Sequence, residues 1–364
     1  MKILNKEKLE RAIEQRICDD LAQCNIGGAS LLVVQAGKLL YKKHVGTDDQ
    51  TIFRLASMTK PITAVATMIL VERGALSLDD PIDRFYPDFS KMVVYGTDSQ
   101  AEIYPKITVK HLLTHTSGIG SGAAWDESLT RMTDRDIESV EQFIDFLSRQ
   151  PLSYLPETRQ EYSGIGAFSV LTGIIQKLTG MSYAEFLKKE IFEPCQMTEA
   201  TFEPSAEQWR RVIEMHDKKD GQNVVGQTYD GCVFEWIPPH NYLGGAGLVA
   251  TMEDYWNFAC MLMNGGTFNG KRILSKSSVE VISTPYFPTG SKEHWGLGVR
   301  VITNEQKSTL PLGTFGWSGA YGTHFWIDPT NEIIGIYMKN SRYDGGSGAR
   351  TSKNFEIDVY SALN

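Results

Sequence analysis

Long apolar runs, basic clusters and paired cysteines are all missing from this 364-residue sequence. No stretch approaches the roughly 18 apolar residues that a membrane-spanning helix needs, so we expect no membrane association. Residues 1–8 are charged and contain no apolar core region, which predicts no signal peptide and a cytoplasmic location. The cysteines are odd in number, irregularly spaced and form no Cys-x-x-Cys pair, which predicts free thiols in a reducing compartment. They are Cys18, Cys24, Cys195, Cys232 and Cys260.

The charge balance is acidic, with a formal net charge of −8. No run of Lys or Arg appears, so the sequence predicts no nucleic-acid partner. His111 and His115 are four residues apart, as metal-binding histidines on a helix can be. The setting is not His-Glu-x-x-His, however, and no nearby third ligand stands out. We therefore expect no metal site at this pair.

Strand signals gather at the two ends of the chain, and helix signals gather in its middle. An apolar stripe at helical spacing predicts a helix over residues 5–24, and a glycine turn separates two strands at 29–35 and 39–45. Further helices are expected at 58–73, 107–113, 137–149, 163–179, 182–190, 252–264, 275–282 and 349–363. Further strands are expected at 295–301, 313–319, 323–327 and 333–339, with a local hairpin within 216–236.

This order of elements predicts an α+β fold of the α/β sandwich type. Strands from both chain ends form one antiparallel sheet, the terminal helices flank it, and a mostly helical lobe is inserted. We assign residues 1–56 together with 290–364 to the sheet lobe and residues 57–289 to the helical lobe. A cleft between two such lobes is a common place for a ligand site, so we expect the catalytic cleft there.

Ser57 and Lys60 form a Ser-x-x-Lys pair at the start of an apolar helical segment. Residues three apart share a helix face, so the Lys60 amine can reach the Ser57 hydroxyl. A hydroxyl attacks well only when a base takes its proton, and a lysine can act as that base only when neutral. Burial and the positive helix N-terminus both lower a lysine pKa. The alternative is that Ser57 only caps the helix, because two fixed residues recur by chance.

Two later segments supply further candidate groups. Tyr162, in a loop before a helix, could share a proton with the serine or pass it to a leaving group, and a tyrosine that only packs is the alternative. Residues 316–329 combine a short strand, small residues and a glycine turn. Backbone N–H groups on such a strand can stabilise the oxyanion of acyl transfer, and an ordinary edge hairpin is the alternative.

Taken together and in this order, the segments resemble the serine β-lactamase and penicillin-binding-protein superfamily. Within it they are most similar to class C β-lactamases and, closer still, to family VIII carboxylesterases. The resemblance implies a β-lactamase/transpeptidase-like fold and covers about residues 26–340. The matching segments are 53–61 (the nucleophile segment), 112–118 (a structural loop), 162–164 (a Tyr-Ser-Gly segment), 244–251 (a glycine-rich segment beside the cleft) and 317–319 (Trp-Ser-Gly).

Two departures from the β-lactamase pattern distinguish the subfamilies. Trp317 stands where β-lactamases have the lysine of Lys-Thr-Gly, which binds the carboxylate of the drug, and a neutral indole cannot pair with a carboxylate. Gly164 stands where the asparagine of Tyr-x-Asn orients an amide side chain. Both changes disfavour an anionic β-lactam and are compatible with a neutral ester. Trp317 and Tyr321, with Trp125 and Trp236 as further candidates, are expected to line an apolar pocket.

The resemblance implies a serine hydrolase that works through an acyl-enzyme without a metal or organic cofactor. Ser57 attacks the ester carbonyl, Lys60 and Tyr162 accept its proton, and Tyr162 protonates the leaving alcohol. Which of the two is the formal base stays open, because such coupled groups titrate as a unit. The backbone N–H groups of Ser57 and Ala320 form the oxyanion hole, and water releases the acyl group. The implied substrate-binding positions are Trp317, Ser318, Gly319, Tyr321 and Gly245.

The function favoured by the sequence is a serine carboxylesterase acting on short-chain neutral esters, with a small-molecule ester as its partner. Alternatives on the same three residues are a β-lactamase, a D-amino-acid peptidase or other amide hydrolase, and an acyltransferase. A non-catalytic sensor or scaffold of the same fold is a more remote alternative. Serine, lysine and tyrosine together argue against it, since a scaffold has no use for the set. The physiological ester, its acyl chain length and the oligomeric state stay open.

Overall fold

The computed structural model describes residues 1–96, 101–102, 106–225, 242–286, 293–304, 308–341 and 349–364. Its largest element is a seven-stranded sheet with the strand order β11-β12-β13-β14-β15-β1-β2, in which every neighbouring pair is antiparallel. The expected antiparallel sheet built from both chain ends is therefore confirmed. Its strands are β1 (Ala29–Gln35), β2 (Lys38–Val45), β11 (Glu293–Trp295), β12 (Arg300–Ile302), β13 (Phe315–Ser318), β14 (His324–Asp328) and β15 (Ile333–Lys339).

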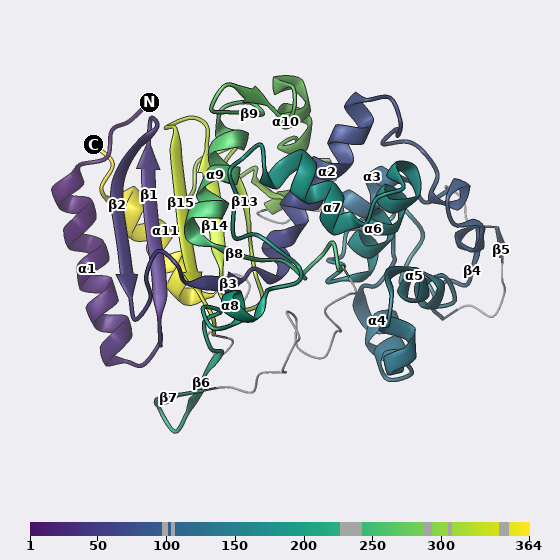
Figure 1. Cartoon of the computed structure of the whole chain (residues 1–364), viewed down its shortest axis with the longest axis horizontal. Coiled ribbons are helices and arrows are strands. Elements are labelled where there is room, and N and C mark those ends of the chain that lie inside the picture. The colour runs from purple at the N-terminus through teal and green to yellow at the C-terminus, as the bar shows by residue number, and fades with distance from the viewer. Residues whose placement is uncertain (97–100, 103–105, 226–241, 287–292, 305–307, 342–348) are drawn as a thin grey trace.

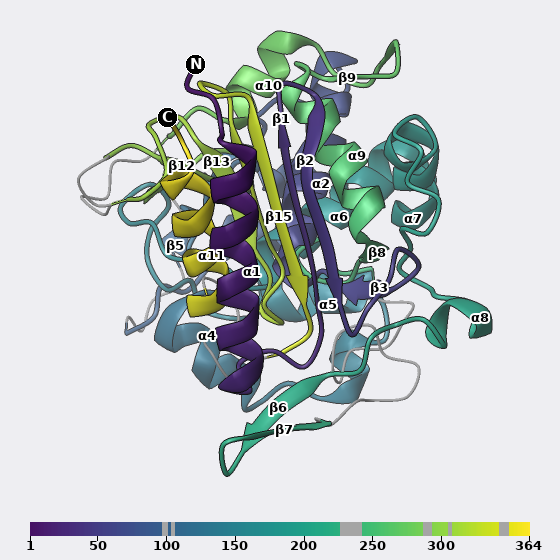
Figure 2. The same cartoon turned by 90° about the vertical axis from the view of Figure 1, so that its left-hand side faces the viewer.

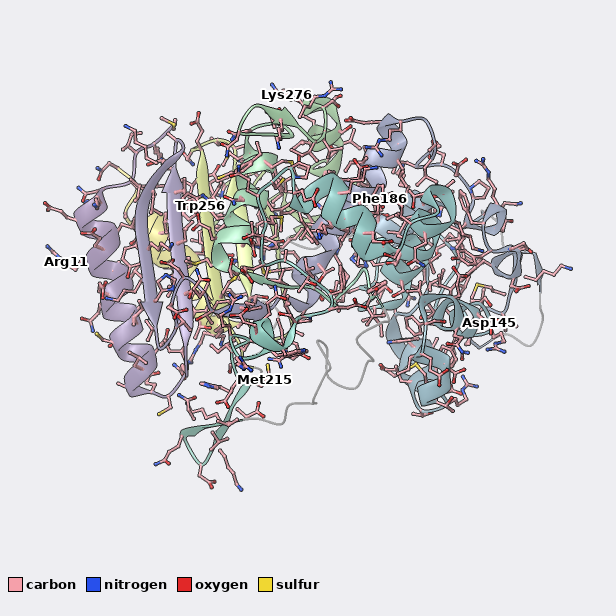
Figure 3. The ribbon with its side chains drawn as sticks, in the orientation of Figure 1. Arg11, Asp145, Phe186, Met215, Trp256 and Lys276 are labelled. Carbon is pink, nitrogen blue, oxygen red and sulfur yellow. The ribbon has the colours of Figure 1, made fainter. Side chains whose placement is uncertain are left out.

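The N-terminal strands join the C-terminal ones through β1, which pairs with β15 from Ala29↔Lys339 to Gln35↔Ile333. Every residue of β1 is buried, since helices cover both faces of the sheet at this point. One face carries the terminal helices α1 (Lys6–Ala22) and α11 (Arg350–Ser361), which lie side by side in Figure 2. Figure 3 shows Arg11 pointing outward from the exposed side of α1. The two chain ends thus form one outer layer.

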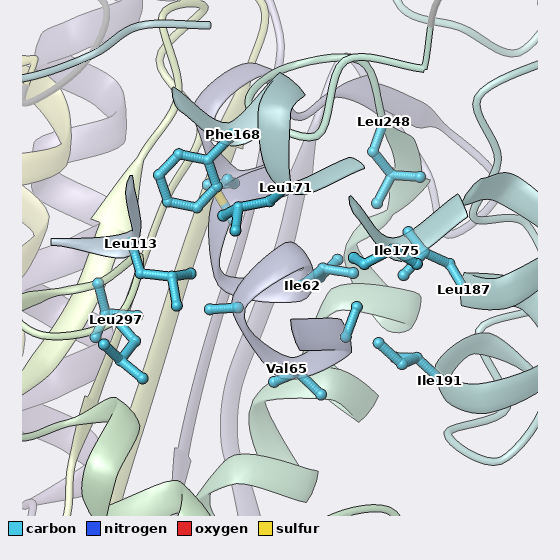
Figure 4. Close-up of a cluster of buried hydrophobic side chains, with 14 of the residues drawn as sticks. Ile62, Val65, Leu113, Phe168, Leu171, Ile175, Leu187, Ile191, Leu248 and Leu297 are labelled. Carbon is cyan, nitrogen blue, oxygen red and sulfur yellow. The ribbon is translucent and has the colours of Figure 1, made fainter. Parts of the chain in front are cut away.

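The other face of the sheet meets the helical part of the molecule (Figure 1). Helix α9 (Met252–Met263) packs on β15, and α2 (Thr59–Glu72) runs through the middle of the main hydrophobic core. Figure 4 shows Ile62 and Val65 of α2 among apolar side chains from several other helices. Residues 59–70 of α2 are all buried, so this helix is enclosed on every side. That enclosure matters because Lys60 lies in its first turn.

Shorter elements complete the described part of the chain. The remaining helices are α3 (Val109–Leu113), α4 (Gly122–Leu129), α5 (Val140–Ser148), α6 (Gly166–Thr179), α7 (Tyr183–Leu187), α8 (Ala206–Trp209) and α10 (Lys276–Ile282). Short 3₁₀ turns lie at Ala56–Met58, Ile82–Arg84, Pro87–Ser90 and Asp134–Ile137, and a π-helical turn at Lys188–Phe192. Two-stranded pairs are β3 (Ile52–Arg54) with β8 (Val249–Thr251), β4 (Lys91–Met92) with β5 (Ala101–Glu102), β6 (His216–Lys219) with β7 (Gln222–Val225) and β9 (Thr267–Phe268) with β10 (Lys271–Arg272).

One predicted strand is wrong in a way that matters for the site. The strand expected over 295–301 is two antiparallel strands, β11 and β12, joined by a turn and paired from Glu293↔Ile302 to Trp295↔Arg300. Gly298 has a φ of +69°, a conformation that glycine adopts without a steric penalty, so the chain reverses there. The reversal leaves Trp295 at the end of the edge strand β11.

Other differences are local. Helix α4 was not predicted, and the helix predicted at 182–190 contains a π-helical turn, where the chain leaves the α-helical hydrogen-bond pattern. The expected hairpin within 216–236 is present as β6 and β7, while residues 226–236, including Trp236, lie outside the described residues. The boundaries proposed for the two lobes stay a prediction. No helix in the described ranges combines the length and the apolar character required to cross a membrane.

Candidate active site

Ser57 lies in the 3₁₀ turn that connects β3 with α2. The turn begins at Ala56, whose φ of +46° is unusual for a residue with a side chain and costs on the order of 1–3 kcal/mol. Backbone hydrogen bonds from Leu55 N–H to the Leu248 carbonyl (3.0 Å) and from Met58 N–H to the Leu55 carbonyl (3.1 Å) hold the turn in place. Ser57 therefore precedes the regular helix and is held in a tight, strained turn.

Lys60 is completely buried one turn after Ser57. Its Nζ lies 3.3 Å from Ser57 Oγ, and it donates to the backbone carbonyls of Gly164 (2.5 Å) and Gly245 (2.9 Å). Burial holds the pKa of Lys60 well below its ordinary value, which favours the neutral form of the amine. A neutral amine has two N–H groups and one lone pair. When the two carbonyls accept both of these N–H groups, the neutral form directs its lone pair at Ser57. Gly245, expected as a substrate contact, thus contacts the lysine through its carbonyl.

Tyr162 approaches Ser57 from the helical part of the molecule. Its hydroxyl donates to Ser57 Oγ at 2.6 Å, and the indole Nε1–H of Trp317 donates to the Tyr162 hydroxyl oxygen at 3.3 Å. Burial raises the pKa of Tyr162 to about 12, even though its hydrogen bonds with Ser57 and Trp317 act in the opposite direction. Tyr162 is therefore a protonated phenol at neutral pH. The pKa of Lys60 is lowered and that of Tyr162 is raised. Such opposite pKa shifts on neighbouring groups suit one of them to act as a base and the other as an acid.

Aromatic rings surround the Tyr162 side chain. The Trp295 ring stacks on it at 5.6 Å between centroids, and the Trp317 ring lies 4.3 Å from that of Trp295. Sequence reasoning missed Trp295, because no pattern links it to Tyr162 across the intervening chain. Both tryptophans are only partly buried, so they can offer apolar surface to a ligand.

His115 is a second residue near Tyr162 to which the sequence analysis gave no role of its own. It is buried, its ring lies 4.7 Å from that of Tyr162, and its Nδ1 accepts the Ser163 N–H at 3.1 Å. Burial, together with the nearby Lys60, holds the pKa of His115 well below its ordinary value, so the ring is neutral. His115 thus orients the loop that carries Tyr162. The one sequence signal for this role was the position of His115 within the segment 112–118, which resembles a structural loop of the family.

The connection between β13 and β14 lies directly against the nucleophile turn. A Cβ on Gly319 would lie 2.3 Å from the Leu55 carbonyl oxygen, so only glycine fits there. Thr323 Oγ1 donates to the same carbonyl at 3.1 Å. Among the residues that the structure describes, the N–H groups of Ser57 and Ala320 have no hydrogen-bond partner. They are the two groups expected to form an oxyanion hole.

The other residues predicted to bind substrate are almost completely buried. Ser318 is 2% exposed and its hydroxyl contacts His324, on the sheet face that carries the terminal helices. Tyr321 is also 2% exposed and packs with Ala56 and Met215. Their direct contact with substrate stays a prediction, as does that of Gly319.

The additional aromatic candidates were Trp125 and Trp236. Trp125 lies on α4 against Phe143 of α5, with 6.4 Å between ring centroids, and Trp236 falls outside the described residues. Within the described ranges, no three His, Cys, Asp or Glu side chains gather as metal ligands would.

Comparison with known proteins identifies the family. The beta-lactamase family model matches residues 13–354. Esterase EstB of Burkholderia gladioli is 28% identical, over 91% of this chain and 90% of its own, and Penicillin-binding protein 4* of Bacillus subtilis (strain 168) is 31% identical, over 91% of this chain and 72% of its own. The solved structure of EstCE1, described as a hydrolase with promiscuous acyltransferase activity, has a TM-score of 0.82 at 21% identity and covers 98% of this chain and 99% of its own. The resemblance inferred from the motifs is thus confirmed, and the chain belongs to the β-lactamase family, within the β-lactamase-fold superfamily of serine hydrolases.

Proposed function

We propose that this protein is a serine carboxylesterase that hydrolyses short-chain neutral esters through an acyl-enzyme on Ser57. The observation that carries this proposal is that a neutral indole, that of Trp317, donates to the Tyr162 hydroxyl beside Ser57. Trp317 stands where β-lactamases have a lysine ammonium. An indole gives the carboxylate of a β-lactam or peptide no ionic partner, whereas an ester needs none. The similarity to esterase EstB supports the same reading and the family VIII assignment.

The polar contacts around Ser57 form a directed chain of donors. The Trp317 N–H donates to the Tyr162 oxygen, and the Tyr162 O–H donates to the Ser57 oxygen. In the neutral form of Lys60, the amine nitrogen can take the Ser57 proton, because it lies 3.3 Å from Ser57 Oγ. As Ser57 Oγ bonds to the ester carbonyl carbon, its proton passes to Lys60. Lys60 is therefore the proposed base, because its lowered pKa favours the neutral amine while Tyr162 keeps its proton.

Tyr162 is the proposed acid. Negative charge on the carbonyl oxygen is stabilised by the backbone N–H groups of Ser57 and Ala320. When the intermediate collapses, the bond to the leaving alkoxide breaks and Tyr162 supplies a proton to that oxygen, while the proton on Lys60 replenishes the tyrosine. Water then repeats the sequence on the acyl-enzyme, so that a carboxylic acid is released. The chemistry requires no metal or organic cofactor.

The aromatic surface beside these groups suits a small neutral acyl or alcohol group. Trp295 and Trp317 supply partly exposed apolar surface next to Tyr162. A Cβ at Gly164 would meet no described atom within 4 Å, so packing does not require a glycine there. Among the described residues, nothing fills the space that an amide-orienting asparagine would take up. The cytoplasmic location stays a prediction.

A direct comparison of substrates tests the proposal. We expect kcat/KM for p-nitrophenyl butyrate to exceed that for the cephalosporin nitrocefin by at least about ten- to a hundredfold, the value of one hydrogen bond to a charged group. Both rates are measured on one preparation by colour release. Equal or better values for nitrocefin would favour a β-lactamase. Faster transfer to an added alcohol than to water would favour an acyltransferase. No turnover of either class would favour a sensor.

The variant Trp317→Lys provides a matched check on the same position. We expect it to improve turnover of a p-nitrophenyl ester that carries a free carboxylate, relative to p-nitrophenyl butyrate. Both leaving groups are the same, so the ratio isolates the carboxylate. An unchanged ratio would mean that Trp317 does not occupy the carboxylate-binding position.

The pH dependence of hydrolysis follows from the two shifted pKa values. Protonated Lys60 cannot accept the serine proton, so kcat/KM is expected to fall as the pH drops through the lowered pKa of this lysine. On the alkaline side, activity is lost only when Tyr162 deprotonates, near its pKa of about 12. We therefore expect a plateau that reaches at least about pH 10, measured with spontaneous ester hydrolysis subtracted. A decline as the pH rises from neutral towards 10 would contradict these roles.

A further inference from the structure

A chain of buried polar side chains lies on the sheet face opposite the catalytic groups. Ser318 Oγ lies 2.8 Å from Nδ1 of His324, and Nε2 of the same ring lies 2.8 Å from Oε1 of Glu356. Arg300 donates to that oxygen at 3.3 Å. The four residues come from β13, β14, α11 and β12. The network therefore joins the C-terminal helix to three neighbouring strands.

The members of this network are all buried. Ser318, His324, Glu356 and Arg300 are 2%, 1%, 6% and 6% exposed. Burial alone would raise the pKa of Glu356, but the hydrogen bond from His324 and the nearby Arg300 hold it below its ordinary value, so the carboxylate is ionised. An ionised Glu356 accepts the Nε2–H of His324, and Nδ1 of the same ring is hydrogen-bonded to the Ser318 hydroxyl. The burial excludes an acyl substrate, so these residues are not a second Ser-His-Glu catalytic site.

The network lies at the base of the hairpin that reaches Ser57. Ser318 and His324 are paired residues of β13 and β14, and the connection between them carries Ala320. Within that connection the Gly319 N–H donates to the Thr323 carbonyl at 2.7 Å. Thr323 in turn contacts the carbonyl of Leu55, two residues before the nucleophile. A shift at the Ser318–His324 pair would therefore move the Ala320 N–H relative to Ser57.

We propose that His324 is a positioning residue for the oxyanion hole: anchored by Glu356 on α11, it holds Ser318 and with it the backbone that presents the Ala320 N–H. The inference rests on the proposed function, because it assigns Ala320 to the oxyanion hole. Oxyanion donors act within a narrow distance range, and a misplacement of about 1 Å can cost about a hundredfold in rate. Apolar packing could hold the two strands together, but only directed hydrogen bonds fix the side-chain pair at the hairpin base.

The test compares two variants that each remove one contact between β14 and α11. His324→Phe keeps a ring but removes both hydrogen bonds. Tyr360→Phe removes the 2.9 Å hydrogen bond from Tyr360 to Asp328, which joins the same two elements at the far end of β14. For His324→Phe we expect kcat on p-nitrophenyl butyrate to fall about ten- to a hundredfold with KM within about twofold of wild type. For Tyr360→Phe we expect unchanged kcat, even if its thermal midpoint falls by as much as that of His324→Phe.

Two further variants separate positioning from stability. His324→Asn places an oxygen where Nδ1 was, so it can still accept the Ser318 hydroxyl, and we expect it to recover most of the lost kcat. Ser318→Ala removes a single hydroxyl with little risk to folding, and we expect it to lower kcat in the same direction as His324→Phe. Rates are normalised to the folded fraction measured by circular dichroism.

The labelling rate of Ser57 by a fluorophosphonate provides a readout that does not depend on the ester. This reagent also develops negative charge on an oxygen, so the same His324 variants should slow it. Wild-type protein that is labelled but inert towards esters would contradict the proposed substrate class and leave the labelling rates to decide the role of His324. Equal kcat and labelling rates in His324→Phe, Tyr360→Phe and wild type would overturn the role of His324.

Discussion

Ser57→Ala is expected to abolish ester hydrolysis and leave the fold intact. The change deletes the oxygen that lies between Lys60 Nζ at 3.3 Å and the Tyr162 hydroxyl at 2.6 Å. Loss of the nucleophile in a serine hydrolase costs about 10⁴- to 10⁶-fold in kcat. The side chain is small and the turn is held by backbone hydrogen bonds, so the thermal midpoint should change little. The measurements are kcat on p-nitrophenyl butyrate and thermal unfolding of both proteins.

Labelling identifies the nucleophile directly. A fluorophosphonate should add one group to the wild type, located at Ser57 by peptide mass, and none to Ser57→Ala. Ser169→Ala is the matched control, because Ser169 is buried in α6 and donates its hydroxyl to the Ile165 carbonyl. We expect this control to be fully labelled and active. Modification at another serine, or a fully active Ser57→Ala, would refute the assignment.

Lys60→Arg is expected to be nearly inactive although it keeps a basic side chain. Arginine stays protonated at any pH at which proteins fold, so it cannot accept the Ser57 proton. Loss of a general base costs about 10²- to 10⁴-fold. The measurement is kcat/KM on p-nitrophenyl butyrate. Lys177→Arg is the matched control, because Lys177 also donates to a backbone carbonyl, that of Phe85, but lies at an exposed contact far from Ser57 in the chain.

The bulk of arginine in a completely buried position is a second possible cause of inactivity. Lys60→Met resolves this, because methionine has nearly the same length, carries no charge and fits a buried site without desolvation. We expect Lys60→Met to fold well and to be as inactive as Lys60→Arg. If Lys60→Met kept most of the activity, Lys60 would only fill space and another group would be the base.

The parts of the fold that local patterns describe were predicted well. The apolar stripe of α1, the β1–β2 hairpin and the strands β13 to β15 all lie close to their predicted ranges. In the strand predicted over 295–301, a single residue was responsible for the failure. Gly298, with its positive φ, turned one predicted strand into two. An apolar segment with an internal glycine does not reveal by itself whether the chain bends there or continues.

The sequence by itself determined the family, the antiparallel sheet drawn from both chain ends, and the pairing of Ser57 with Lys60, since a spacing of three residues on a helix sets that contact locally. Only the tertiary structure decided which distant residues surround the pair. Trp295 and His115 reach Tyr162 through the packing of separate elements, and His324 joins Ser318 to Glu356 from the far side of the sheet. These contacts leave no periodic signal, because they depend on how strands and helices pack against each other. The pKa of Lys60 is lowered for the same reason: its burial is a property of the assembled core around α2.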